Sequence, residues 1–332
     1  MLKKNSYLIT GGTGSFGKAF VKKLINSSKK ISRLVIFSRD ELKQFEMAQM
    51  FPVKKYPFIR FFIGDIRDSN RVISATESIE TIIHAAALKQ VPTTEYNPFE
   101  AIKTNIIGAN NLIEAALKNS VKNVIALSTD KACSPINLYG ATKLCSDKLF
   151  ISANNIKGNR NIKFSVVRYG NVFGSRGSVV PLFLKKNPGA LPITDREMTR
   201  FNISLEYATD IVFWSLSNLS GGELLVPKLP SYKILDLARA INPKCKIKIA
   251  GIRPGEKIHE EMISTSDSQN TLELKKFYII LPKLNKEIFT KYKNKYGAKK
   301  VKKGFTYSSN INSKFLSIIE LRKLVKKFEN DF

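Results

Sequence analysis

Short apolar runs alternate with amphipathic stretches along the first half of this chain of 332 residues, and the alternation predicts its secondary structure. Six apolar runs have the length and composition of buried strands: residues 7–9, 34–37, 58–63, 81–84, 124–128 and 164–168. Helical patterns lie between them, among them residues 16–25, 100–118 and 139–154. Strands that alternate with helices in this way form parallel sheets covered by helices, so we expect a doubly wound α/β fold.

The pattern changes after Tyr169. Gly, Pro and Arg residues cluster through residues 170–192, which we expect to form loops over a ligand site. A further apolar run at residues 222–226 predicts a strand that returns to the edge of the sheet. Residues 291–303 are rich in lysine and weakly patterned, and we expect this segment to be mobile.

A glycine-rich turn joins the first predicted strand to the first predicted helix. Its glycines lie three residues apart, which permits a tight turn, close approach of the backbone to a pyrophosphate, and close packing of helix on strand. The helix that follows directs free N–H groups toward the phosphates. A plain turn is the alternative. The position between a strand and a helix favours a Rossmann-type dinucleotide site made by Gly11, Thr13, Gly14, Ser15, Phe16 and Gly17.

The interrupted pattern and the glycine-rich turn together suggest two interleaved domains. We expect residues 1–170 to form a dinucleotide-binding domain, to which residues 203–229 return. Residues 171–202 and 230–332 are then expected to form a smaller substrate-binding domain. The length of the chain is sufficient for about two domains.

The end of the second predicted strand bears on the identity of the dinucleotide. NAD-binding folds place an acid there to accept from the ribose 2′-hydroxyl, whereas this chain has Ser38 followed by Arg39, with Lys43 one turn later. Two cations and a hydroxyl suit a 2′-phosphate, so we expect NADP; the alternative is a solvated helix start. From this strand onward, the predicted cofactor residues are Ser38, Arg39, Asp40, Glu41, Leu42, Lys43, Asp65, Ile66, Ala85, Lys89, Tyr139, Lys143 and Val172.

The formal charge of +28 requires a choice between a nucleic-acid partner and a lysine-rich surface. The excess is spread along the chain without a helix-turn-helix, zinc-finger or RNP pattern, so we expect no nucleic-acid role. No apolar run approaches the ~20 residues that span a membrane, and the glycine-rich turn starts too early for a targeting segment to be expected. Three cysteines favour free thiols in a reducing cytoplasm, and two histidines argue against a histidine-based metal site.

Tyr139 and Lys143 lie four residues apart on a predicted helix and therefore share one face. A nearby ammonium stabilises a phenolate, which lets Tyr139 act as a base toward a sugar hydroxyl. Thr129, Asp130 and Lys131 follow the fifth predicted strand, at the sheet edge where ligands bind. A Tyr-x-x-x-Lys pair alone occurs often by chance. Only its combination with the glycine-rich turn and the strand-end residues indicates chemistry.

In this order, these features resemble the extended short-chain dehydrogenase/reductase superfamily, whose members mostly act on nucleotide sugars. A closer resemblance, over residues 7–282, is to the inverting UDP-N-acetylglucosamine 4,6-dehydratases. It is carried by SRDELK (38–43), STDKA (128–132), NLYGATK (137–143), RYGNV (168–172), PITD (192–195), MTRF (198–201) and GIRPGEK (251–257). Asn202 departs from the pattern, which has tryptophan there. That family opens pseudaminic acid synthesis for flagellin glycosylation and forms dimers or larger assemblies such as hexamers.

The resemblance implies a role for each catalytic residue. Tyr139, poised by Lys143, takes the C4 hydroxyl proton, while tightly bound NADP accepts a hydride that later returns to C6. Lys131 removes the C5 proton, Asp130 protonates the leaving C6 hydroxyl, and a proton delivered to the opposite face inverts C5. Lys131 is a base only if burial or nearby positive charge lowers its pKa. The alternative is an ion pair with Asp130 that holds the loop.

The resemblance also implies the substrate, UDP-N-acetylglucosamine, and the product, UDP-2-acetamido-2,6-dideoxy-beta-L-arabino-hex-4-ulose. Two other functions stay open: a retaining dehydratase or 4-epimerase, and a non-catalytic protein that senses nicotinamide or carries RNA. His84 follows an apolar run and is expected to be a core residue. The implied substrate contacts, each with an ordinary surface or turn role as its alternative, are Lys89, Thr129, Asn171, Arg200, Arg253 and Glu256.

Overall fold

The computed structural model describes residues 5–27, 30–175, 177–185 and 190–330. Residues 1–4, where we expect no targeting segment, lie outside the described residues, as do parts of the expected substrate-binding domain at 176, 186–189 and 331–332. None of the helices in the described ranges is both long and apolar enough to cross a bilayer.

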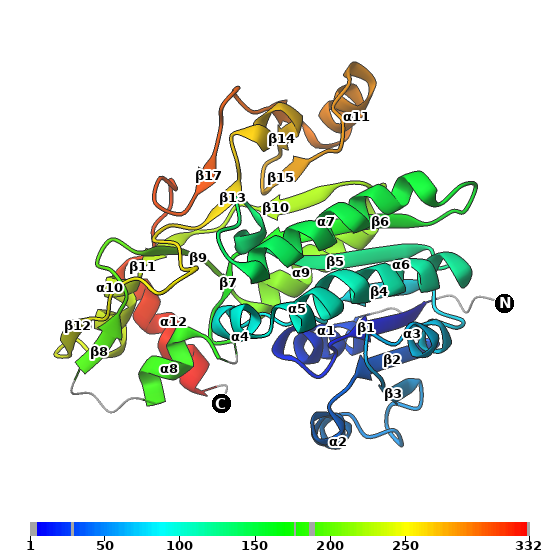
Figure 1. The fold of residues 1–332 in the computed structure, drawn as a ribbon, viewed down its shortest axis with the longest axis horizontal. Coiled ribbons are helices and arrows are strands. Elements are labelled where there is room, and N and C mark those ends of the chain that lie inside the picture. The colour runs from blue at the N-terminus through cyan, green and yellow to red at the C-terminus, as the bar shows by residue number, and fades with distance from the viewer. Residues whose placement is uncertain (1–4, 28–29, 176, 186–189, 331–332) are drawn as a thin grey trace.

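Within the described chain, a ten-stranded sheet has the order β16-β14-β15-β10-β6-β5-β4-β1-β2-β3 (Figure 1). From β10 to β3 all neighbouring strands are parallel, which confirms the predicted α/β fold. The order reverses between β1 and β4, and ligands bind beside such a reversal at the carboxyl ends of the strands. The parallel strands are β1 (Ser6–Thr10), β2 (Arg33–Ser38), β3 (Ile59–Ile63), β4 (Thr81–His84), β5 (Asn123–Thr129), β6 (Lys163–Tyr169) and β10 (Leu224–Pro227).

Helices cover both faces of the parallel strands (Figure 1). On one face, α1 (Ser15–Ile25) packs on α9 (Leu205–Asn218), while on the other α6 (Gly108–Lys118) packs on α3 (Ser69–Ala75) and α7 (Leu138–Ile156). α2 (Glu41–Met50) lies beside β3. The helix predicted at 100–118 consists of three consecutive helical segments: α5 (Pro98–Ile102), a π-helical turn η1 (Lys103–Ile107) and α6. It follows the short helix α4 (Val91–Tyr96).

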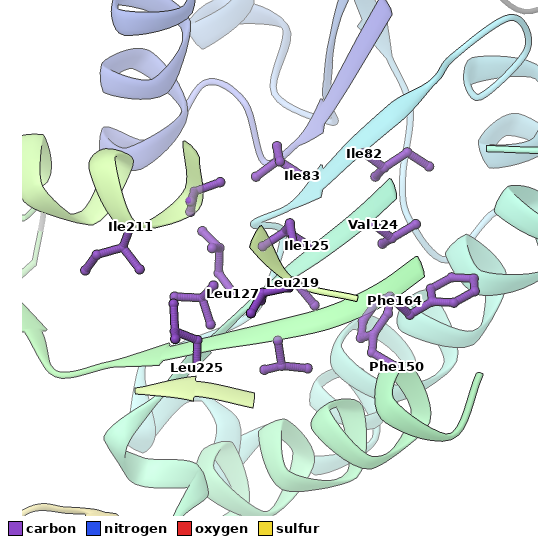
Figure 2. Packing of buried hydrophobic residues seen from close by; sticks show 14 of the residues in the cluster. Ile82, Ile83, Val124, Ile125, Leu127, Phe150, Phe164, Ile211, Leu219 and Leu225 are labelled. Carbon is purple, nitrogen blue, oxygen red and sulfur yellow. The ribbon is translucent and has the colours of Figure 1, made fainter. Parts of the chain in front are cut away.

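The main core lies between the sheet and these two helical layers. Because both faces are covered, β1, β2, β4, β5, β6 and β10 are buried at nearly every position rather than at alternate positions. Phe150 of α7 and Ile211 of α9 approach the strands from opposite faces (Figure 2). Each fully buried aliphatic or aromatic side chain here contributes about 1.5–3 kcal/mol. The strand side chains labelled in this core are Ile82, Ile83, Val124, Ile125, Leu127, Phe164 and Leu225.

A second, smaller core lies beyond the carboxyl ends of the strands. It contains Phe183, Met198, Leu237 and Leu321, all buried. The elements around it are β7 (Asn171–Val172), α8 (Val179–Lys185), β8 (Ala190–Ile193), β9 (Thr199–Ile203), β11 (Ser231–Lys233), α10 (Ile234–Ile241), β12 (Lys246–Ile249) and α12 (Ile318–Asn330). The expectation that residues 170–192 are loops is therefore wrong for β7, α8 and β8: apolar residues of α8 and β8 fill this core, and Val172 of β7 packs on the main core.

The strand predicted at residues 222–226 is β10, but it is not an edge strand. Antiparallel β15 (Phe277–Ile280) pairs with it, followed by β14 (Thr271–Glu273) and β16 (Lys299–Lys300). The lysine-rich stretch 291–303, expected to be mobile, instead contributes to α11 (Lys286–Tyr296) and to β16. Tyr292 explains this difference, because its buried ring anchors α11 to the main core. β13 (Glu261–Ile263) pairs with β17 (Tyr307–Ser308), and η3 (Ser266–Asn270) precedes β14.

Candidate active site

The glycine-rich turn lies at the carboxyl end of β1. Gly14 donates its N–H to the Gly11 carbonyl at 3.0 Å and precedes α1 without a capping side chain. A Cβ at Gly17 would overlap the carbonyl oxygen of Gly12, so α1 packs on the turn only with glycine there. Ser15 and Phe16 form the first turn of α1, where unpaired N–H groups attract phosphate. These residues fit a dinucleotide pyrophosphate.

The carboxylate nearest to the end of β2 is used to cap a helix. Asp40 accepts from the Lys43 N–H at 3.0 Å, and its second oxygen pairs with the Lys43 ammonium. Ser38 Oγ lies 2.9 Å from Thr13 Oγ1, which joins the strand end to the glycine-rich turn. The Arg39 side chain is 54% exposed. The groups that this strand end presents to solvent therefore include an exposed guanidinium beside a hydroxyl, rather than an uncommitted carboxylate.

Asp65 lies between two guanidinium groups at the end of β3. Arg67 Nη2 donates to Asp65 Oδ2 at 2.7 Å, and Arg39 Nη1 lies 3.7 Å from the same oxygen. Burial raises the pKa of Asp65, but the hydrogen bonds from Arg67 and the charges of both arginines outweigh it, so the pKa is lowered. Asp65 thus stays ionised and draws Arg39 toward the expected adenosine end.

The other predicted cofactor residues are distributed around the same part of the fold. Ile66 is buried after β3, and Ala85 follows β4, where its N–H donates to the Thr10 carbonyl at 3.2 Å. Val172 lies in β7. Leu42 differs from these, because it is an exposed side chain on the first turn of α2, next to Glu41.

Thr129, Asp130 and Lys131 form a hydrogen-bonded cluster at the carboxyl end of β5. The Thr129 hydroxyl donates to Asp130 Oδ1 at 2.9 Å, and Lys131 Nζ donates to the same oxygen at 3.1 Å. Asp130 and Lys131 begin the short turn η2 (Asp130–Ala132). Burial, aided by the charge of Glu260, raises the pKa of Asp130 even though the Lys131 ammonium opposes it. A raised pKa suits a carboxyl group that has to donate a proton.

Tyr139 and Lys143 lie on the first two turns of α7, and both are buried. Burial raises the pKa of Tyr139 to about 12, against the Lys131 charge and a hydrogen bond with Thr129. Burial lowers the pKa of Lys143, with Asp147 opposing the change. Tyr139 is therefore a phenol at neutral pH. A further positive charge beside its hydroxyl is needed to make it a base.

Lys131 is placed between two carboxylates. Besides its contact with Asp130, its Nζ lies 2.9 Å from Glu260 Oε1. Burial lowers the pKa of Lys131, but the charges of Asp130 and Glu260 outweigh it, and the pKa is raised. A base at this position needs a lowered pKa, but the surrounding protein groups raise the pKa of Lys131. The ion pair with Asp130, the alternative role, is present.

Arg200, predicted to contact the substrate, is buried among protein groups. It is only 6% exposed, and its guanidinium donates to the carbonyl oxygens of Thr199, Ile258 and Lys257 at 2.8, 3.0 and 2.9 Å. Its Nε lies 3.6 Å from Glu260 Oε1. These contacts hold the segment that carries Glu260 close to Lys131.

The remaining predicted substrate residues lie on three segments around this edge. Arg253 is exposed and pairs with Glu256 at 2.9 Å, and these bonds and charges lower the pKa of Glu256 although burial raises it. Lys89 follows β4, and burial and the Lys131 charge lower its pKa. Asn171 and Asn202 are register partners in β7 and β9, and neither buried Oδ1 has a hydrogen-bond partner among the described residues.

Sequence reasoning missed both Glu260 and Asn105. Asn105 lies in the π-turn, where its side chain donates to the Leu88 carbonyl at 2.9 Å and accepts from the Leu88 N–H at 2.8 Å. It also donates to Thr142 Oγ1 at 3.0 Å, and so ties the segment before Lys89 to α7. For Asn105 the sequence did hold a signal, namely a polar residue at a position of the predicted helix that is expected to be buried. His84 is buried, as expected for a core residue.

The sheet order, the glycine-rich turn and the Tyr139–Lys143 pair define a nucleotide-binding protein of the extended short-chain dehydrogenase/reductase class. Residues 7–282 match the family described as polysaccharide biosynthesis protein. The chain therefore belongs to that family, in the branch that contains the inverting UDP-N-acetylglucosamine 4,6-dehydratases.

Two curated relatives carry different activities. The chain is 52% identical to the inverting UDP-N-acetylglucosamine 4,6-dehydratase of Campylobacter jejuni subsp. jejuni serotype O:2, over 99% of both chains. It is 40% identical to a protein named UDP-glucose 4-epimerase from Rickettsia bellii, over 98% of this chain and 96% of that protein.

Solved structures confirm the fold. The structure of Pen from Bacillus thuringiensis is 38% identical with a TM-score of 0.88 and covers 99% of both chains. DesIV, the dTDP-glucose 4,6-dehydratase of Streptomyces venezuelae with NAD and TYD bound, has a TM-score of 0.71 at 17% identity, with 98% of this chain and 97% of that chain covered. At that identity the likeness concerns the fold alone.

Proposed function

We propose that this protein is an inverting 4,6-dehydratase that acts on UDP-N-acetylglucosamine. The observation that carries the proposal is the ion pair between Lys131 and the buried Asp130, 3.1 Å apart at the end of β5 and beside Tyr139. Removal of water across C5 and C6 needs an acid and a base in addition to the tyrosine that serves C4. The similarity to the Campylobacter dehydratase over the whole chain supports the same reaction.

The residues around the glycine-rich turn fit a nicotinamide dinucleotide. When bound, such a cofactor accepts a hydride from C4 of the sugar and returns it to C6. Gly11, Gly14 and Gly17 would hold its pyrophosphate at the start of α1. Tyr139 Oη takes the C4 hydroxyl proton, and the charges of Lys143 and of the oxidised nicotinamide ring favour its phenolate.

The elimination uses one proton of the Asp130–Lys131 pair. Transfer of a proton from Lys131 Nζ to Asp130 Oδ1 gives a neutral amine and a neutral carboxylic acid. The amine then takes the C5 proton next to the 4-ketone, while the C6–O bond breaks and Asp130 gives its proton to the leaving oxygen. The pair ends as ammonium and carboxylate, which is the arrangement in the structure.

We further propose NADP rather than NAD as the cofactor. The support is the exposed Arg39 guanidinium beside Ser38, together with the use of Asp40 as a helix cap. A 2′-phosphate binds to such a guanidinium, whereas the ribose diol of NAD prefers a carboxylate. DesIV, which shares the fold alone, holds NAD in its structure.

Several finer points rest on the resemblance to the dehydratase family. We propose that the elements of the smaller core bind the nucleotide sugar, that the chain forms a homo-oligomer, and that its product opens pseudaminic acid synthesis for flagellin glycosylation. The three cysteines, Cys133, Cys145 and Cys245, are free thiols, which supports a cytoplasmic location as part of the same proposal.

The second candidate function is a 4-epimerase, which the rickettsial relative favours by its name. An epimerase needs the tyrosine base and no elimination, so it gives the Asp130–Lys131 pair no chemical task. Mass spectrometry of the sugar nucleotide after incubation with the purified protein separates the two. We expect a product lighter by one water, whereas an unchanged mass would favour the epimerase.

A further inference from the structure

Glu260 is a buried carboxylate that no part of the proposed mechanism uses. It is 1% exposed, and it lies just before β13, far along the chain from the catalytic turn η2. Its Oε1 contacts Lys131 Nζ at 2.9 Å, which is shorter than the 3.1 Å contact of Lys131 with Asp130. A carboxylate buried this deeply normally has a specific cationic partner, because desolvation of the charge is costly.

Three segments hold Glu260 in place. Its N–H donates to Ser309 Oγ at 2.9 Å, and its carbonyl accepts from the Ser309 N–H at 2.8 Å. Ser309 Oγ lies 2.7 Å from Thr199 Oγ1. Arg200 holds the preceding residues by their carbonyl oxygens and approaches Glu260 Oε1 at 3.6 Å. The carboxylate is therefore fixed before any ligand binds, including by a segment beyond residues 7–282.

From this geometry we propose that Glu260 is a positioning residue, which holds the Lys131 side chain and sets the proton balance of the Asp130–Lys131 pair. The inference rests on the proposed dehydratase function. When Asp130 carries the proton, an N–H of the neutral Lys131 amine still donates to Glu260, while rotation about Cε–Nζ turns the lone pair from Asp130 toward the substrate. When Lys131 has taken the C5 proton, Glu260 stabilises the ammonium that has formed.

The charges that face Lys131 make this role specific. Asp130 and Glu260 supply two carboxylates in direct contact with Lys131. Arg200 and Lys89 supply two cations farther away. The hydroxyls of Tyr139 and Tyr232 also lie within its field. Among the described residues, Asp130 Oδ2 and Glu260 Oε2 are buried without hydrogen-bond partners. In the proposed elimination Asp130 Oδ1 carries the proton for the leaving hydroxyl, while Glu260 provides the counter-charge.

Loss of the Glu260 charge has a calculable consequence for the pH profile. The active form of the Asp130–Lys131 pair carries one proton, so gain or loss of a proton inactivates it. Without the negative charge of Glu260, both of these protonation steps move to lower pH. For a charge at this distance we expect a shift of roughly one to three pH units. A residue that only supports the fold would lower the rate at every pH without moving the profile.

The experiment is the pH dependence of dehydration for the full-length wild type and Glu260→Gln, with UDP-N-acetylglucosamine and NADP. We expect the profile of the variant to move to lower pH, a roughly 100-fold lower rate, and retained oxidation at C4, seen as accumulation of reduced cofactor. Should Glu260→Gln fail to fold, Glu260→Asp is the second variant. Its shorter side chain moves the carboxylate away from Lys131, so we expect a smaller shift of the profile in the same direction.

Two control variants isolate the charge effect. Ser309→Ala loosens the backbone of Glu260 and keeps its charge, so it lowers the rate without a pH shift. Glu197→Gln removes an exposed carboxylate of the same region and leaves the profile unchanged. An unshifted profile for a folded Glu260 variant would overturn this inference. Absence of any dehydration by the wild type would overturn the proposed function instead.

Discussion

Gly140 lies so close to Lys131 that a Cβ at residue 140 would overlap the carbonyl oxygen of residue 131. Gly140 belongs to the first turn of α7, next to Tyr139, and Lys131 belongs to the turn after β5. One backbone contact therefore fixes the residue proposed to serve C4 relative to the residue proposed to serve C5. Residue 140, between Tyr139 and Lys143, therefore has to be glycine because of this contact, which the spacing of the motif does not reveal.

Replacement of Gly140 by alanine tests this contact. A shift of about 1 Å in a catalytic group commonly costs about 100-fold in rate, so we expect Gly140→Ala to lower kcat by roughly that factor. Steady-state kinetics and circular dichroism measure the activity and the fold. Cys145→Ala, an exposed position on the same helix, is the control and keeps full activity. A Gly140→Ala enzyme with the wild-type rate would show that the contact does not position the site.

Lys131→Met tests the proposed base. The change removes the amine and keeps a side chain of similar length, so oxidation at C4 continues while loss of water falls by roughly 100- to 10,000-fold. Reduced cofactor then accumulates on mixing with UDP-N-acetylglucosamine, and its absorbance follows the first step alone. A variant that dehydrates the substrate at the normal rate would remove Lys131 from the mechanism.

Arg39→Ala tests the preference for NADP. One charge-assisted hydrogen bond contributes about 1.5–3 kcal/mol, so NADP binding weakens by roughly 10- to 100-fold while NAD binding hardly changes. Calorimetric titration of both cofactors measures the two affinities. Lys54→Ala removes an exposed cation elsewhere and serves as the control for net charge. Equal losses for NAD and NADP would mean that Arg39 does not contact the 2′-phosphate.

His84 gives a prediction for stability against pH. It is 1% exposed, its Nδ1 lies 2.8 Å from Thr10 Oγ1, and burial, with the charge of Lys143, lowers its pKa to about 3. The unfolded chain binds a proton near pH 6.5 and the folded chain does not. The His84 contribution to stability is therefore full above pH 6.5 and is lost as the pH falls toward 3, at up to about 1.4 kcal/mol per pH unit.

Urea unfolding between pH 7 and pH 4 measures this loss. We expect the free energy of unfolding to fall less steeply with acidification for His84→Gln than for the wild type. His259→Gln is the comparison variant: His259 is only partly buried, and although burial and the Arg200 charge lower its pKa too, Glu197 and Asp195 oppose the change, so we expect a smaller effect on the slope. Parallel curves for the wild type and His84→Gln would contradict the lowered pKa of His84.

Sequence patterns were sufficient for the parallel half of the fold and for the residues at its strand ends. Apolar runs marked β1 to β6 because strands buried on both faces have no polar alternation. The antiparallel addition to the sheet was not predicted. β14 to β16 are short, and the many lysines of α11 concealed a helix that is anchored by one buried tyrosine, Tyr292.

The candidate site was predictable where its residues are contiguous or share a helical spacing, as Tyr139 and Lys143 do. Thr129, Asp130 and Lys131 are contiguous, so their proximity follows from the strand end. Glu260 reaches Lys131 through tertiary packing, which no local spacing encodes. Arg200 is predicted to hold the nucleotide, and in the structure its guanidinium donates to the carbonyl oxygens of Lys257 and Ile258, a long-range contact that no local spacing shows.

The structure of the product formed from UDP-N-acetylglucosamine in deuterated water tests the central proposal most directly. NMR of that product should show a methyl group at C6, a ketone at C4, deuterium at C5 and inverted configuration at C5. Those features together require C4 oxidation, loss of water and reprotonation from the opposite face. A product that keeps oxygen at C6, with only C4 epimerised, would contradict the dehydratase assignment, and a deuterated product with retained C5 would contradict the inverting mechanism.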